Sequence, residues 1–97
     1  MRVRNLNGTR DNVCACGSWI DHWERFSGET ALFCAAQGCP NLADVGAHVR
    51  KAAGGDDRWY IIPLCRDCNM RRGDIDIEDG TVLVSANRAE TCAKKAG

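Results

Sequence analysis

The chain has 97 residues, which is enough for one compact domain, residues 1–97, and not for two. Its thirteen basic and thirteen acidic side chains cancel, which excludes a polycation that coats nucleic acid indiscriminately. The hydrophobic core of so small a domain stabilises the fold only weakly. Seven cysteines in so short a chain therefore predict additional stabilisation, either by disulfide bonds or by a bound metal ion.

Whether the cysteines form disulfides or bind metal depends on whether the protein lies in an oxidising or a reducing compartment. The first eight residues carry basic side chains without an apolar run behind them, so we find no pattern of a secretory signal. No stretch approaches the roughly 20 apolar residues that a membrane span needs. We therefore expect a cytoplasmic protein without membrane contact, where clustered cysteines are typical of metal sites or catalytic groups. The odd number of cysteines also disfavours a complete disulfide set.

The N-terminal third predicts one helix after an irregular start. Residues 1–13 are polar and contain turn signals, which indicates irregular structure. Residues 18–28 predict a short helix, with Ser18 suited to its N-cap and Gly28 suited to its end. Bulky apolar side chains recur at helical spacing and form a stripe typical of a face packed on a core: Trp19, Ile20, Trp23 and Phe26.

The rest of the chain predicts strands and one further helix. Strand patterns cover residues 30–33, 44–50, 58–64 and 81–85. The second and third of these predict a hairpin around the loop at residues 52–57, whose glycines and aspartates are turn formers. A short helix is expected to begin at Asn69 and to end near Gly73.

Four cysteines have the spacing of a zinc site. Cys34 and Cys39 are separated by four residues, and Cys65 and Cys68 by two. Zinc is commonly bound by two such ligand pairs on tight turns, and the 25 residues between the pairs can form a hairpin that brings them together. A redox dithiol at Cys65 and Cys68 would require a βαβ pattern, which is absent, and would leave the first pair unexplained. The sequence therefore predicts one structural Zn²⁺.

The remaining cysteines allow a second metal site. Together with a histidine of the expected helix they can supply four further ligands near the two ends of the chain. The alternative is that the three thiols are buried and free, and that the histidine faces solvent. The residues of this second site are Cys14, Cys16, His22 and Cys92.

Residues 60–73, YIIPLCRDCNMRRG, resemble the end of the HNH endonuclease motif, the ββα or His-Me finger in its zinc-containing form. Ala47-His48-Val49 upstream and the paired cysteines extend the resemblance to residues 34–73. It implies a small α+β fold: a treble-clef zinc-binding ββα finger, here with an added N-terminal helix and a C-terminal strand. The four cysteines would then hold the zinc behind an active centre.

The resemblance also implies catalytic roles. His48 matches the general base, and Asn69 matches the helix residue that coordinates a catalytic Mg²⁺ or Mn²⁺. Ala47 replaces a metal-binding carboxylate or histidine, and Tyr60 or Trp59 replaces the asparagine that orients the base. Each residue also has a purely structural alternative. His48 could be a buried histidine whose hydrogen bonds are made inside the domain, and Asn69 could be the N-cap of the following helix.

Nucleic acid is the expected partner, with DNA favoured over RNA. Residues 48–72 contain six basic and three acidic side chains, which permits a local phosphate-binding face, although a solvated charged surface would look the same. We thus expect a zinc-binding HNH-like domain that binds nucleic acid, and the sequence leaves open whether it also hydrolyses phosphodiesters with a divalent cation. The alternatives are an inactive module that binds nucleic acid or a protein and, last, a thiol redox protein. The candidate phosphate-binding residues are Arg50, Lys51, Arg66, Arg71 and Arg72.

Overall fold

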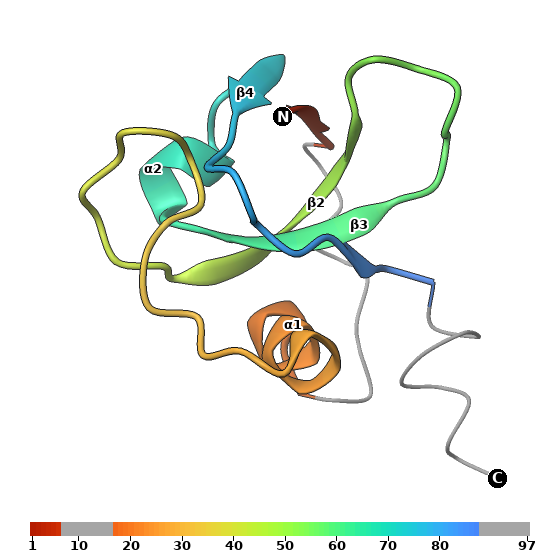
Figure 1. The fold of residues 1–97 in the computed structure, drawn as a ribbon. Helices are drawn as coiled ribbons and strands as arrows, with labels where there is room; N and C mark the ends of the chain where they lie inside the picture. The colour runs from red at the N-terminus through yellow and green to blue at the C-terminus, as the bar shows by residue number, and fades with distance from the viewer. Residues whose placement is uncertain (7–16, 88–97) are drawn as a thin grey trace, which may run out of the picture.

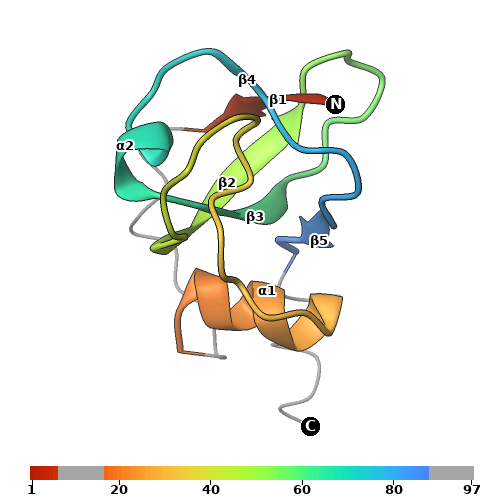
Figure 2. The ribbon, with the colours of Figure 1, turned by 60° about the vertical axis from the view of Figure 1, so that its left-hand side comes forward.

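A computed structural model of the chain describes residues 1–6 and 17–87. These residues form a small α+β fold around a five-stranded antiparallel sheet of strand order β4-β1-β2-β3-β5. Helix α1 lies on one side of the β2–β3 hairpin, and α2 lies on the other (Figures 1 and 2). The elements are β1 (Arg2–Asn5), α1 (Trp19–Ser27), β2 (Val45–Lys51), β3 (Tyr60–Leu64), α2 (Arg66–Asn69), β4 (Asp74–Asp76) and β5 (Val84–Ser85). The α+β class is thereby confirmed.

The hairpin of β2 and β3 divides the side chains between the two faces of the sheet. Ala47 pairs with Ile62, and both belong to the larger core, which also contains the buried cysteines. His48 pairs with Ile61 on the opposite face, because successive strand residues alternate. Ile61 packs in a smaller core with Trp23 of α1. The predicted strands at 44–50 and 58–64 are confirmed within a few residues.

Helix α1 forms where the sequence predicts it. The Ser18 hydroxyl accepts a hydrogen bond from the Asp21 N–H at 3.1 Å, and Gly28 ends the helix with a φ of 76°. The buried face differs from the predicted stripe, because His22 is buried whereas Phe26 is 40% exposed. Within residues 1–6 and 17–87, neither helix has the length and apolar composition of a membrane span.

The predicted irregular start is wrong for Arg2–Asn5, which form β1 inside the sheet. Val3 is fully buried and pairs with Lys51 of β2 on one side and with Ile75 of β4 on the other. A strand of four residues has too few alternating polar and apolar positions to be predicted from its own sequence, and β2 and β4, its partners, are distant in the sequence. Residues 7–13 lie outside the described part of the chain.

Two further strand predictions need correction. Residues 30–33 do not form a strand, and only an isolated bridge joins Phe33 to Leu42. The predicted strand at 81–85 is reduced to Val84–Ser85, while Asp74–Asp76 form a strand that the sequence did not indicate. Residues 74–76, in which aspartate alternates with isoleucine, form a strand because β1 supplies the backbone hydrogen-bond partners.

The helix expected to begin at Asn69 instead ends there. Cys65 is the N-cap of α2, and its Sγ accepts a hydrogen bond from the Cys68 N–H at 3.4 Å. A cysteine that caps a turn in this way sets the start of the helix before the second cysteine rather than after it. Asn69 is therefore not an N-cap.

Candidate metal centre

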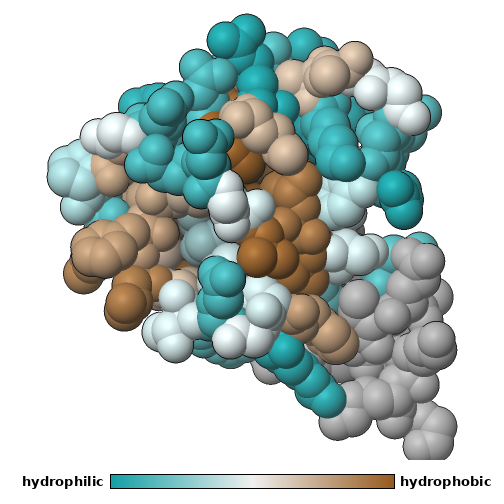
Figure 3. All heavy atoms as spheres, viewed as in Figure 1, coloured by the Kyte–Doolittle hydropathy of each residue, from teal (hydrophilic) through white to brown (hydrophobic). Residues whose placement is uncertain are grey.

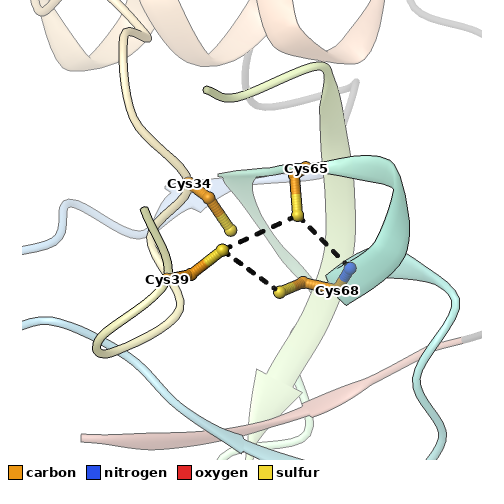
Figure 4. Close-up of side chains that lie close together, drawn as sticks. All are labelled: Cys34, Cys39, Cys65 and Cys68. Atoms are coloured by element: carbon orange, nitrogen blue, oxygen red, sulfur yellow. Dashed lines mark hydrogen bonds between the residues drawn. The ribbon is translucent and has the colours of Figure 1, made fainter. Parts of the chain in front are cut away.

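The four cysteines predicted to bind zinc come together on one face of the sheet. Cys34 and Cys39 come from the loop between α1 and β2, and Cys65 and Cys68 from the start of α2, with their sulfurs pointing toward one another (Figure 4). All four Sγ atoms lie within 4.8 Å of one another. Cys34, Cys65 and Cys68 are buried, whereas Cys39 is half-buried.

The spacing of the sulfurs fits one tetrahedral metal ion. Four thiolates bound to zinc at about 2.3 Å have sulfurs about 3.8 Å apart. The Cys39 Sγ lies 3.9 Å from the Cys65 Sγ and 3.8 Å from the Cys68 Sγ. These separations are far longer than the roughly 2.05 Å of a disulfide bond, and all four cysteines are free thiols. The donor set is therefore compatible with Zn²⁺, as the sequence predicts.

Burial makes it unfavourable for the four thiols to ionise without a bound cation. It raises the pKa of Cys34 and of Cys68, and at Cys68 the neighbouring thiols raise the pKa further. Burial also opposes ionisation of Cys65, but hydrogen bonds from the Cys68 N–H and from Asn41 outweigh it and lower the pKa to about 7. A divalent cation would hold all four groups as thiolates in a place where several anions would otherwise repel one another.

Backbone and side-chain hydrogen bonds hold the two cysteine turns in position. The Cys34 N–H donates to the Asn41 carbonyl at 3.0 Å, and the Asn41 side chain donates to the Cys65 Sγ at 3.6 Å. The Asp44 carboxylate accepts from the Arg66 N–H at 3.2 Å, at the first residue of α2. The supporting role of Asn41 and Asp44 was not predicted from the sequence, although an asparagine or aspartate beside a cysteine turn is a reasonable signal of such support.

The second predicted metal site is represented only by His22 in the described part of the chain. Its ring is fully buried, and its Nε2 lies 2.8 Å from the Ser85 carbonyl oxygen. Cys14, Cys16 and Cys92 lie outside the described residues. His22 thus does not face solvent, and it joins α1 to β5.

His48, the predicted general base, is buried under α1. It is 5% exposed, and its ring lies 4.6 Å from the ring of Trp19 and 6.0 Å from that of Trp59, measured between centroids. Its Nε2 is buried, and no hydrogen-bond partner for it occurs among residues 1–6 and 17–87. Burial, with a smaller contribution from His22, lowers the pKa of His48.

This environment predicts acid sensitivity. The folded protein binds a proton at His48 less readily than the unfolded chain, so the free energy of unfolding should fall as the pH drops below about 6.5, until the lowered pKa is passed. Melting temperatures of the zinc-saturated protein should therefore decline more steeply from pH 7.5 to 5.5 than those of His48→Gln. Loss of zinc in acid lowers the melting temperature of both proteins alike. Parallel curves of melting temperature against pH would therefore show that protonation of His48 does not contribute to the acid sensitivity.

Asn69 and the candidate phosphate-binding residues lie around α2 and on β2. The side chain of Asn5 donates to the Asn69 carbonyl at 2.6 Å and to the Arg71 carbonyl at 3.1 Å, which fixes the turn after α2 to β1. The role of Asn5 was not predicted from the sequence, because no local pattern indicates it. Arg66 is exposed at the first position of α2, and Arg71 and Arg72 are exposed in the turn that follows it. Arg50 and Lys51 are half-buried on β2.

Comparisons with protein families, with curated proteins and with solved structures give no match to this chain. The cysteine cluster is thus the feature of the described residues that carries chemistry most directly.

Proposed function

We propose that the chain is a zinc-stapled HNH-like module of the treble-clef type, and that it binds nucleic acid, DNA in preference to RNA, without cleaving it. The observation that carries this proposal is a group of exposed arginines, beside the cysteine cluster, that have no ion-pair partner among residues 1–6 and 17–87. Arg66, Arg71 and Arg72 form no ion pair with any carboxylate of the described residues. Unpaired guanidinium groups suit phosphate, which they can bind in a bidentate manner.

Most other basic side chains of the described segments are already neutralised. Arg2 pairs with Asp76 at 2.8 Å, and Arg4 pairs with Asp74 at 3.0 Å across adjacent strands. Lys51 lies 3.4 Å from the Asp56 carboxylate, so this predicted phosphate-binding residue is the least suited of the five. Among the described residues, most of the basic side chains left without a carboxylate partner thus lie near α2, so a chain of zero net charge can still present a local basic surface.

The backbone that carries these arginines is held in place. The zinc ligands Cys65 and Cys68 flank the start of α2, and the Asn5 side chain binds two carbonyls of the following turn. Arg50 follows Val49, the residue that pairs with Asn5, and it has no ion-pair partner in the described segments. A surface ordered in advance loses less entropy when phosphate binds.

Binding should be measured by fluorescence anisotropy with labelled duplex DNA and with single-stranded RNA at several salt concentrations. Alanine at Arg66, Arg71 and Arg72 together should weaken DNA binding about tenfold or more and should reduce the slope against log salt by about three. The matched control replaces Arg2, Arg25 and Arg58, which are also exposed, with alanine, so that the net charge changes equally. Equal losses in both triple variants, or no binding by the unmutated protein at low salt, would contradict the proposal.

One observation favours hydrolysis as a second candidate function. The imidazole of His48 stays neutral at lower pH than usual, and its Nε2 has no described partner, as a general base requires. Burial between two tryptophan rings argues against it, because a base must reach the attacking water. Incubation of the zinc-loaded protein with plasmid and with RNA in Mg²⁺ or Mn²⁺ should leave both intact. Cleavage that His48→Ala abolishes would establish the nuclease instead.

A further inference from the structure

The loop between α1 and β2 exposes large apolar side chains that the cysteine cluster does not use. Leu32 is 58% exposed and Phe33 is 64% exposed, immediately before the first metal ligand. Figure 3 shows hydrophobic side chains gathered at the left of the molecule, where Figure 1 places this loop. Exposed apolar groups that gather in one place commonly mark an interaction site.

Beside these side chains the surface forms a groove of about 320 Å³. The groove lies between three segments of the chain: the loop after α1, the end of β3, and the turn before β5. Trp23 contributes to it from α1 and is held by its Nε1–H, which donates to the Val82 carbonyl at 2.9 Å. The apolar lining consists of Trp23, Ala31, Leu32, Phe33, Ala35 and Pro63.

The same groove contains three exposed carboxylates, from Glu29, Glu78 and Asp79. None of them forms an ion pair with a basic group in the part of the chain that the structure describes. The turn that carries two of them is fixed, because the Glu78 N–H donates to the Ala35 carbonyl at 2.9 Å and Thr81 Oγ1 donates to the Glu78 carbonyl at 2.7 Å. The groove is therefore apolar, acidic and largely preformed.

We propose that this groove binds a basic polypeptide segment of a partner protein, in which an aromatic or branched aliphatic side chain is flanked by lysine or arginine. The apolar side chain would lie against Phe33 and Leu32, and the flanking cations would face the three carboxylates. Charge complementarity selects this occupant, since nucleic acid would be repelled here. The groove thus differs in charge from the arginine surface near α2, and the proposal does not depend on nucleic-acid binding.

The test is selection of random dodecapeptides displayed on phage against the zinc-loaded protein, followed by anisotropy of the best labelled peptide. The groove variant combines Phe33→Ser with Glu78→Gln. The matched control combines Met70→Ser with Asp67→Asn, because Met70 is 75% exposed and neither residue lines the groove. Zinc content and circular dichroism should be unchanged in both variants.

The proposal expects peptides rich in lysine or arginine around an apolar residue, with binding about tenfold or more weaker to the groove variant and unchanged in the control. No enrichment, acidic peptides, or equal binding to both variants would overturn it. Analytical ultracentrifugation tests whether the groove instead binds a second copy of the chain. If the unmutated protein self-associates and the groove variant does not, the occupant is a second copy, and the proposed peptide occupant is overturned.

Discussion

Cys68→Ser is expected to leave the chain unfolded at 25 °C, even with zinc in excess. Cys68 is 1% exposed and lies in the larger core with two other buried cysteines, so the cluster and the core are one structure. A structural zinc site contributes on the order of 10 kcal/mol to folding, which is comparable to the 5 to 15 kcal/mol or so that stabilises an ordinary domain. Far-ultraviolet circular dichroism, tryptophan fluorescence and zinc content of the purified variant measure the effect.

Two matched variants separate the loss of metal from the loss of a buried thiol. Cys39 is the half-buried ligand, so Cys39→His should retain zinc and the fold where Cys39→Ser loses both, because imidazole can replace thiolate as a ligand. Cys92→Ser removes a cysteine outside the cluster and should change neither property. A Cys68→Ser protein that melts at the same temperature as the unmutated chain would show that no metal stabilises the fold.

Gly46→Ala is expected to destabilise the protein by about 3 kcal/mol or more, at the upper end of the cost of overpacking. A Cβ at this position would lie 2.4 Å from the carbonyl carbon of Trp19 and 2.5 Å from the backbone nitrogen of Ile20. Both atoms belong to the first turn of α1, which would have to move away from β2 as a unit. Chemical denaturation followed by circular dichroism measures the change in the free energy of unfolding.

The control for this steric effect is Gly38→Ala. Gly38 has a φ of 76°, and a Cβ there would meet nothing within 4 Å, so only the backbone cost of roughly 1 to 2 kcal/mol is expected. Because α1 and the cysteines pack in separate cores on opposite faces of the sheet, Gly46→Ala should retain its zinc in the folded fraction. Equal destabilisation by the two substitutions would contradict the close packing of α1 on Gly46.

The parts of the fold that the sequence predicted correctly depend on neighbouring residues. Ser18 and Gly28 mark the ends of α1 through contacts within four residues, and the hairpin follows from strand composition on both sides of a glycine-rich loop. Ligand spacing predicted the cysteine cluster because each pair occupies a single turn. In all three cases the deciding interactions were local.

The errors concern pairings between distant residues. β1 pairs with β4, which joins Val3 to Ile75, 72 residues apart in the sequence, and neither segment is long enough for its alternation to indicate a strand. The position of His48 could not be read either, because alternation places it opposite Ala47 but does not indicate which face α1 covers. The burial of His22 on α1, which contradicts the alternative that it faces solvent, could not be predicted for the same reason.

We propose that Cys34, Cys39, Cys65 and Cys68 bind one zinc ion, which thereby holds the fold together. Zinc X-ray absorption of the purified protein, with the metal content determined on the same sample, tests it most directly. The result we predict is one tightly bound zinc per chain with four sulfur ligands at about 2.3 Å. A folded protein without metal, or a shell that contains nitrogen ligands at about 2.0 Å, would contradict a four-cysteine site.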